Sequence, residues 1–274
     1  MKYRNLIFSK DRASQLLALL ESLERHCLDI TSIDTCVLYL VTTEQHERQY
    51  KQLEETHDWV KFQREKNIES DILSLLQDTE HVTFFTDDSI CIRDFRIKEV
   101  AEMLQAQQDS IGFSLRLGRN ITYSYPHSCS QDKVDFEEIA ANILKINWTK
   151  YKCDFGYPME LSSSVYRTSE ILQMLCGTNM STLKHVENSL WQRSKQKMTN
   201  KKPYLLCYPV SRTFSNALNI TAPDTGNRYS KRQDCTIEKM ADNFDEGYKI
   251  DVSTFDIFTP IGCHQEVDLS WVKR

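Results

Sequence analysis

Short apolar runs and longer amphipathic stretches alternate along the first 115 residues. The apolar runs predict buried strands at residues 6–8, 34–43, 59–62, 81–86 and 110–115. The stretches between them predict amphipathic helices at residues 12–26, 44–56, 67–77 and 97–108. Strands joined by crossover helices of about a dozen residues are typical of parallel sheets. The pattern therefore predicts an α/β fold with a mostly parallel sheet flanked by helices.

Beyond residue 120 the alternation becomes less regular. We expect a loop over 123–132, an extended or irregular segment over 158–166, a strand over 204–208, and helices over 134–146, 171–176, 182–195 and 233–246. The chain is long enough for one large α/β domain. We therefore expect an α/β part over residues 1–125 and a smaller, irregular part over 126–274, joined in one continuous domain.

Two adjacent carboxylates follow the predicted strand 81–86 at the point where it should end. These residues are Asp87 and Asp88. Neighbouring carboxylates repel each other unless a positive charge lies beside them, so a divalent cation is a natural partner. Ligands of open α/β sheets also bind at the carboxyl ends of the strands. The alternative is a pair of solvated loop acids.

Charge and cysteine spacing narrow the class of protein. The formal net charge of -5 argues against nucleic acid as the main partner, because phosphate backbones favour basic surfaces. The nine cysteines include no Cys-x-x-Cys pair, which favours reduced thiols and a cytoplasmic location. We expect no signal peptide, and the longest apolar run, residues 36–41, is too short for a transmembrane segment.

Two nucleotide-binding motifs are missing from the sequence. No Gly-x-Gly-x-x-Gly follows the first predicted strand, which weakens a dinucleotide-cofactor interpretation. No Gly-x-x-x-x-Gly-Lys-Ser/Thr is present either, which excludes a P-loop. A nucleotide bound at this sheet would therefore need a different phosphate-binding arrangement.

Five segments in a fixed order resemble one family. They are LIFSKDRASQLLALLESL, VTFFTDDSICIRDF, SIGFSLRLGRNIT, DFGYPMELSSSVYRTSEI and LKHVENSLW. This series resembles nucleotide-sugar glycosyltransferases of the GT-A fold, in particular small soluble bacterial and viral enzymes. The resemblance covers most of the chain and thins after residue 210. It implies a hexosyl- or deoxyhexosyl-transferase that takes a nucleotide-sugar donor and a hydroxyl acceptor, for example a glycan.

The resemblance implies a metal site at the acidic pair, known in this family as the DxD motif. Asp88 is the expected direct ligand, Asp87 a second one, and His264 in the tail a further one. The expected cofactor is Mn²⁺ or Mg²⁺, which would neutralise the leaving diphosphate as a Lewis acid. For His264, a structural role in the tail is the alternative.

The resemblance also implies a donor site. After the first strand, the expected donor-binding residues are Ser9, Lys10, Asp11 and Arg12, and after residue 115 they are Arg116 and Arg119. For Asp11 the alternative is the N-cap of the following helix. Gly118 between the two arginines permits close backbone approach. For each arginine the alternative is a surface ion pair.

On the acceptor side, Glu187 matches the family's catalytic acid near the start of a late helix. In inverting chemistry it would accept the proton of the attacking hydroxyl. The nearby polar residues Asp154, Tyr157 and Glu160 are the expected acceptor-binding groups. Relatives usually carry Asp-Gly where this chain has Ser162-Ser163, a departure that leaves a different acceptor as an alternative.

Three other interpretations remain open. A sugar nucleotidyltransferase would need a Gly-rich basic loop after the first strand, which residues 8–12 lack. A non-catalytic GT-A-like binding or scaffold protein is consistent with the changed Ser162-Ser163 pair. A metal-dependent phosphatase would need a second Asp two residues after Asp11. The sequence leaves the donor base, the sugar, the acceptor and the oligomeric state undetermined.

Overall fold

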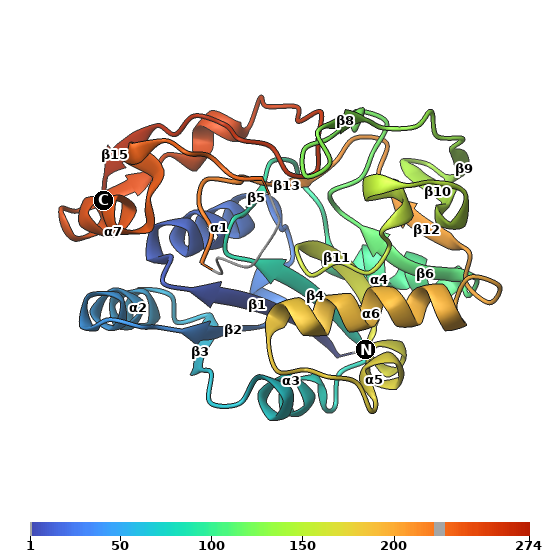
Figure 1. Ribbon diagram of the computed structural model, residues 1–274, viewed down its shortest axis with the longest axis horizontal. Helices are drawn as coiled ribbons and strands as arrows, with labels where there is room; N and C mark the ends of the chain where they lie inside the picture. Colours follow the sequence, from blue (N-terminus) through green and yellow to red (C-terminus); the bar gives the residue numbers. More distant parts are fainter. Residues whose placement is uncertain (1, 222–227) are drawn as a thin grey trace.

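A nine-stranded sheet forms the centre of the protein in this computed structural model, which describes residues 2–221 and 228–274 (Figure 1). The strand order is β3-β2-β1-β4-β11-β6-β12-β10-β9. The strands are β1 (Tyr3–Lys10), β2 (Asp34–Leu40), β3 (Val60–Arg64), β4 (His81–Thr86), β6 (Ser110–Ser114), β9 (Glu137–Ala140), β10 (Ile143–Asn147), β11 (Ser163–Arg167) and β12 (Tyr204–Cys207). The predicted α/β class is therefore confirmed.

The sheet is mainly parallel in strand direction. Strands β3, β2, β1 and β4 are parallel neighbours, and β12 is parallel to β6. Only β11 and β10 run against the others among these nine strands, because each pairs antiparallel with both of its neighbours. The carboxyl ends of β1 and β4 consequently lie side by side, with Phe8 paired to Thr86.

Helices cover both faces of the sheet. They are α1 (Ala13–His26), α2 (Glu44–Thr56), α3 (Ile68–Leu76), α4 (Ile97–Ala106), α5 (Thr168–Leu175), α6 (Leu183–Lys197) and α7 (Ile237–Asp245). Buried side chains of α1, α2 and α4 pack into one apolar core. Those of α3, α5 and α6 pack into a second core on the opposite face. The result is a three-layer arrangement, as expected for strands buried on both sides.

Short elements complete the fold. The two-stranded pairs are β5 (Ser89–Cys91) with β13 (Thr213–Ser215), β7 (Tyr123–Ser124) with β8 (Cys129–Ser130), and β14 (Tyr248–Ile250) with β15 (Trp271–Lys273). The 3₁₀ helices are η1 (Ile30–Ser32), η2 (Trp148–Lys150), η3 (Cys153–Gly156), η4 (Gln233–Cys235) and η5 (Val252–Phe255). A third, smaller core joins the C-terminal part to β5 and α1, and it includes Phe214 and Phe255.

The predicted helix over residues 134–146 is wrong. The structure has a hairpin there, with β9 and β10 joined at Ala141 and Asn142. Asn142 adopts a left-handed backbone conformation with φ of 63°, which Asn tolerates better than most residues. In addition, β10 pairs with β12, so the long-range sheet pairing decides the local structure.

Local capping signals agree with the observed helix starts. The side chain of Asn67 accepts a hydrogen bond from the backbone N–H of Ser70, which identifies Asn67 as the N-cap of α3. Thr182 caps α6 in the same way. Within residues 2–221 and 228–274, no helix is both long and apolar enough to cross a membrane.

Candidate active site

The two carboxylates after β4 have different surroundings. Asp87 is buried, and its carboxylate accepts hydrogen bonds from the Ser9 hydroxyl at 2.9 Å and the Lys10 backbone N–H at 3.1 Å. The guanidinium of Arg12 pairs with it at 2.9 Å. The positive partner that the acid pair requires is therefore an arginine at Asp87. The structure does not present Asp87 as a metal ligand, since protein donors already surround its oxygens.

Asp88 is the more accessible carboxylate, with 21% of its side chain exposed. Thr86 donates a hydrogen bond to it at 2.7 Å. Its backbone carbonyl accepts from the N–H of Asn216 at 2.8 Å, which ties β4 to the segment after β13. Asp88 is therefore held at a fixed position while its side chain still reaches solvent.

The predicted donor residues after β1 mostly form internal contacts. Ser9 bonds to Tyr50 as well as Asp87. The carboxylate of Asp11 accepts both the backbone N–H and the hydroxyl of Thr42 at 2.8 Å. Asp11 is thus not the N-cap of α1, a position that Arg12 occupies without a side-chain cap. It links the end of β1 to the end of β2 from a left-handed conformation, φ 54°.

Lys10 and Arg12 both reach the segment 219–221 but differ in exposure. The ammonium of Lys10 lies 3.4 Å from the carbonyl oxygen of Thr221 and stays partly exposed. The guanidinium of Arg12 pairs with Asp87 and donates a hydrogen bond to the carbonyl of Asn219, and 10% of its side chain is exposed. Of the two predicted phosphate contacts, Lys10 is therefore the more available cation.

His264 is separated from β5, which follows Asp88, by one strand, β13. Ser215 pairs with Ser89 in the β13–β5 ladder and forms a bridge with His264 on its other side. Burial and then Arg116 lower the pKa of His264, while Asp154 and Asp88 oppose the shift. Its Nδ1 atom is buried without a hydrogen-bond partner in the described part of the chain. A neutral imidazole with a free ring nitrogen is a suitable metal ligand.

Arg116 is the centre of a buried ionic cluster. The side chain is almost fully buried, and its nitrogens lie 3.6 Å from carboxylate oxygens of Asp154 and of Glu160. Glu160 accepts further hydrogen bonds from Ser162, from the backbone N–H of Ser163 at 3.1 Å, and from Ser164. The oxygens of Glu160 are thus occupied, which argues for a structural role rather than acceptor binding.

The unusual serine pair supports that same carboxylate. Ser162 bonds Glu160 through its hydroxyl at 2.5 Å, and its carbonyl accepts from Ser89 at 2.5 Å. Ser163 lies in β11 and accepts a hydrogen bond from Thr213 at 2.7 Å. These small hydroxyl groups connect the Arg116 cluster to the β5–β13 pair that holds Asp88.

Glu187 lies in the second turn of α6 and faces this cluster. Burial raises its pKa to about 7, Glu160 adds to the shift, and Arg116 and the backbone N–H of Leu161 oppose it. Asp88 contributes a smaller rise, which places the two carboxylates in one neighbourhood. A carboxylate with a pKa near neutrality is suited to proton transfer at physiological pH.

Tyr157 forms the wall of the site next to Glu187. Its ring stacks on Trp191, one helical turn after Glu187, with ring centroids 5.8 Å apart. Burial raises the pKa of Tyr157 and Glu187 adds to the effect. Asp154 is more enclosed, since it bonds Gln131 and faces Arg116. Of the three predicted acceptor residues, Tyr157 is the one with a partly exposed side chain.

Arg119 lies apart from this group. Its side chain is 50% exposed, pairs with Glu138 at 3.9 Å and packs over the ring of Phe136. It therefore contacts the β9 region, as the surface ion-pair alternative anticipated. The expected close approach at Gly118 is present, since a Cβ there would lie 2.7 Å from the backbone nitrogen of Ser211.

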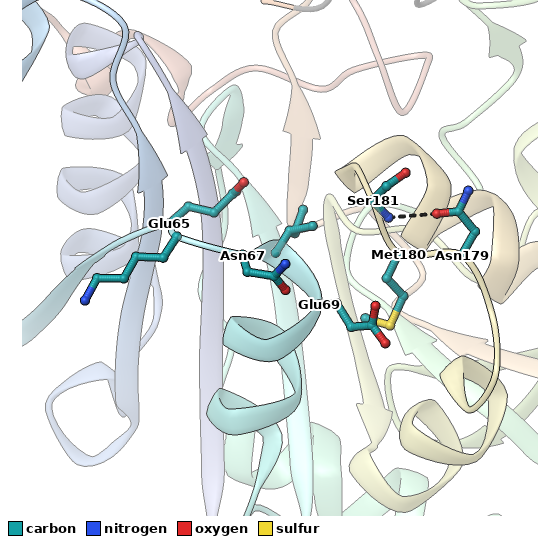
Figure 2. Close-up of a pocket in the computed structure, with 8 residues that line it drawn as sticks. Glu65, Asn67, Glu69, Asn179, Met180 and Ser181 are labelled. Atoms are coloured by element: carbon teal, nitrogen blue, oxygen red, sulfur yellow. Dashed lines mark hydrogen bonds between the residues drawn. The ribbon is translucent and has the colours of Figure 1, made fainter.

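A pocket of about 370 Å³ opens at the same end of the sheet (Figure 2). Glu65, Asn67 and Glu69 line it on one side, from the end of β3 to the first turn of α3. Asn179 and Ser181, from the loop before α6, face them across the gap. Burial and then Asp71 raise the pKa of Glu65, while Lys10 opposes the shift, so the pocket adjoins the end of β1.

Sequence reasoning missed several residues of this region. Tyr50 bonds Ser9 and accepts the backbone N–H of Arg12 at 3.2 Å, and Glu65 and Asn67 line the pocket. Glu65 and Asn67 carried a usable signal, because they directly follow a predicted parallel strand. Tyr50 lies in the middle of a polar helix, and nothing local in the sequence indicates its role.

Among the described residues, no group of three or more His, Cys, Asp or Glu side chains is arranged to hold a metal ion by itself. Mg²⁺ is usually held by one or two carboxylates together with substrate phosphates and water. Asp88 supplies one such carboxylate, and the unpartnered Nδ1 of His264 is a further available ligand atom. The residues present therefore fit a divalent ion that binds together with a diphosphate.

Comparison with known proteins gives one relative at the sequence level and several at the level of structure. No protein-family model matches the chain. Over 193 residues it is 30% identical to the bifunctional glycosyltransferase pgtA of Dictyostelium discoideum. That match covers 64% of this chain and 25% of pgtA, so the chain spans about a quarter of the length of this relative.

Solved structures of S. aureus TarS decide the fold. TarS 1-349 superposes with a TM-score of 0.53 and 15% identity, covering 79% of this chain and 61% of that one. The complex of TarS 1-349 with UDP-GlcNAc gives a TM-score of 0.53 at 11% identity, over 84% and 62% of the two chains. The chain has the GT-A fold. Together with the sequence similarity to the glycosyltransferase pgtA, this fold confirms the expected resemblance to nucleotide-sugar glycosyltransferases of the GT-A fold.

Proposed function

We propose that the protein is a metal-dependent glycosyltransferase that moves a sugar from a nucleoside diphosphate to a hydroxyl acceptor. The GT-A fold and the likeness to pgtA support the reaction class. The observation that carries the proposal is the convergence of Asp88, His264 and Glu187, which come from three distant parts of the chain. The raised pKa of Glu187 beside these two groups supports a role in proton transfer.

The donor would extend along the carboxyl end of the sheet. The pocket of about 370 Å³ has room for a nucleoside, with Glu65 and Asn67 as hydrogen-bonding groups for the base. The diphosphate would then pass the ammonium of Lys10 and reach Asp88 and His264. Mn²⁺ or Mg²⁺ bound there would neutralise charge on the departing nucleoside diphosphate. This arrangement lets an acidic protein bind an anionic substrate.

Glu187 would act as general base in an inverting displacement. Its carboxylate accepts the proton of the acceptor hydroxyl while that oxygen attacks the anomeric carbon and the diphosphate leaves. Arg116 stabilises the ionised form of Glu187 and keeps the neighbouring carboxylates paired. Tyr157 and Trp191 would provide an apolar surface for the acceptor beside the reacting hydroxyl.

Substitution of Asp88 tests the metal role. In Asp88→Asn we expect Mn²⁺-dependent binding of UDP and GDP, measured by calorimetry, to fall at least 10-fold with an unchanged melting temperature. Wild-type protein in excess chelator should behave in the same way, because one of the groups that hold the diphosphate is then missing. Thr86→Ser, which keeps the hydroxyl beside Asp88, is the matched control and should bind normally.

Normal nucleotide binding by Asp88→Asn, or by wild-type protein in chelator, would contradict the assigned metal role. Hydrolysis or transfer from a panel of UDP- and GDP-sugars separates the enzyme from a scaffold. A protein that binds nucleotide sugars with Mn²⁺ but neither hydrolyses nor transfers them would be a non-catalytic binding protein. Release of pyrophosphate from a nucleoside triphosphate and a sugar phosphate would identify a nucleotidyltransferase instead.

A further inference from the structure

Two cysteines from separate segments meet at the surface of the protein. The Sγ atoms of Cys129 in β8 and Cys153 at the start of η3 are 3.8 Å apart. Cys129 is exposed and Cys153 is partly exposed. By contrast, the cysteines at positions 27, 36, 91, 207, 235 and 263 are buried. This pair is therefore open to reagents in solution, as is Cys176 at the end of α5.

The backbone already holds the two thiols close together. Gln131, two residues after Cys129, bonds Asp154, the residue after Cys153. Cys153 also has a left-handed backbone conformation, with φ of 50°, which is costly for a residue that carries a Cβ. Strained positions of this kind persist where the surrounding structure enforces them, often for a functional reason. An S–S bond of about 2.0 Å requires the sulfurs to move closer by roughly 1.8 Å, which is within reach of side-chain rotation.

We propose that Cys129 and Cys153 form a reversible disulfide by exchange with a small-molecule disulfide such as glutathione disulfide. The more exposed Cys129 thiolate attacks the reagent, which forms a mixed disulfide and releases one glutathione thiolate. The Cys153 thiolate then attacks the Cys129 sulfur and releases the second glutathione. The two protein thiols lose two electrons and two protons, and glutathione disulfide is reduced to two glutathione molecules.

The order of attack follows from the surroundings of each thiol. Burial and the adjacent Cys129 thiol raise the pKa of Cys153. Only a small fraction of the Cys153 thiol is therefore ionised, which disfavours its attack on a reagent in solution. The second step is intramolecular and needs only a small thiolate fraction. A pair of this kind closes readily once the exposed cysteine carries the glutathione group.

The disulfide would fix one wall of the proposed site, a consequence that rests on the proposed function. Cys153 directly precedes Asp154, which faces Arg116. Four residues after Cys153, Tyr157 stacks on Trp191 beside Glu187. A disulfide to the β7–β8 hairpin would tether Cys153, while the stacking of Tyr157 on Trp191 holds the other end of residues 153–157. The disulfide would therefore restrict the motion of this segment on the acceptor side.

Peptide mapping of the full chain tests the bond directly. Reduced protein is equilibrated in glutathione buffers of rising disulfide content, alkylated and digested with trypsin without reduction. Cys129 lies in the tryptic peptide 120–133, Cys153 in 153–167 and Cys176 in 168–184. We expect a species whose mass is the sum of the first two peptides minus two hydrogens, and dithiothreitol should remove it. In Cys153→Ser, peptide 120–133 should carry glutathione instead.

Cys176→Ser is the matched control and should keep the cross-linked species. The proposal is overturned if peptides 120–133 and 153–167 stay separate at a glutathione ratio where 168–184 already carries glutathione. Oxidation should also raise the melting temperature of the wild type by several degrees and leave that of Cys153→Ser unchanged. An unchanged melting temperature of the wild type after oxidation would contradict the proposed disulfide. None of these readouts needs sugar transfer, so they fail or succeed independently of the proposed function.

Discussion

At the scale of single residues, adjacent acids with the same chemistry have opposite roles. Asp87 is enclosed by Ser9, Lys10 and Arg12, whereas Asp88 remains partly exposed. The sequence predicts that something positive accompanies the pair, and the resemblance suggests a metal. It does not reveal that Arg12 neutralises one member, because that depends on how the loop after β1 folds back.

Removal of the Asp87 charge should destabilise the protein. Asp87→Asn leaves the buried guanidinium of Arg12 without its nearer ionic partner, so that only Asp88 at 4.0 Å remains. Loss of one partner of a buried ion pair typically costs about 3–5 kcal/mol. We expect the free energy of unfolding, measured by urea denaturation, to fall by this amount. Asp88→Asn is the matched control and should lose less than about 1 kcal/mol. Equal losses in both variants would show that the two carboxylates are not differentiated.

The raised pKa of Glu187 predicts the pH dependence of activity. Below its pKa of about 7 the carboxyl is protonated and cannot accept a proton, so kcat/KM should fall tenfold per pH unit on the acid side. Glu187→Gln should lower kcat by about 10²–10⁴-fold and abolish this acid limb, while donor binding stays unchanged. A wild-type acid limb centred near pH 4.5 would contradict the assignment.

The same shift affects stability with a definite sign. Between the unfolded value of 4.5 and the folded value of about 7, the folded state binds more protons than the unfolded state. Glu187 therefore lowers stability as the pH rises through this window. We expect Glu187→Gln to gain melting temperature relative to wild type at pH 8 and to lose that advantage near pH 4.5. A difference that does not vary with pH would contradict the raised pKa.

At the scale of elements, the regular strand–helix alternation could be predicted from the sequence. In residues 1–115, short apolar runs alternate regularly with amphipathic stretches. The structure has each predicted strand and helix there, and their ends agree within a few residues. In the second half, the helices predicted over 171–176, 182–195 and 233–246 and the strand over 204–208 are also present, whereas the helix over 134–146 is not. The 134–146 segment failed because its apolar positions suit either a helix or a hairpin. Pairing of β10 with β12, a contact between distant segments, decides between them.

The candidate site also combines features that the local sequence indicates with contacts that depend on long-range packing. The acid pair at the end of β4 is a local feature of the sequence, whereas Glu187 is indicated by the resemblance. The structure brings Asp88 and Glu187 into one neighbourhood, and their roles stay predictions. The hydrogen-bonded surroundings of Glu160 and the contacts of Arg119 with β9 depend on long-range packing. No local pattern distinguishes those residues from binding groups.

The N-cap of α6 links helix stability to the position of Glu187. Thr182→Ala removes the bond from Thr182 to the His185 N–H, at 3.2 Å, and should cost about 1 kcal/mol of unfolding free energy. Fraying of the first turn should also lower kcat. Thr236→Ala removes an equivalent cap from α7, also at 3.2 Å, and should cost the same without an effect on kcat. Equal kcat values in both variants would contradict the link.

At the scale of the whole molecule, the C-terminal part packs against the β5–β13 pair that follows Asp88. Phe255 is 2% exposed and packs edge-to-face on Phe214 of β13, at 5.7 Å between centroids. Because β13 pairs with β5 directly after Asp88, packing in this third core bears on the position of the carboxylate. The supporting residues are therefore more than 100 positions away from the group they hold.

Truncation of that packing should weaken both stability and nucleotide binding. Phe255→Ala should lower the free energy of unfolding by about 3–5 kcal/mol through loss of buried surface and the cavity left behind. Mn²⁺-dependent nucleotide affinity should fall as Asp88 loses its support. Ile257→Ala, two residues away and 93% exposed, is the control and should change stability by less than about 0.5 kcal/mol. Full affinity in Phe255→Ala would show that the third core is independent of the site.

The bridge from Ser89 through Ser215 to His264 also has a consequence for biosynthesis. On the ribosome, Asp88 is synthesised well before His264. A nascent chain halted after α6 would contain the sheet's first strands and Glu187 but not the imidazole. If the proposed metal site is right, a nascent chain cannot bind a diphosphate through both groups until the segment that carries His264 has been synthesised and has paired with Ser215.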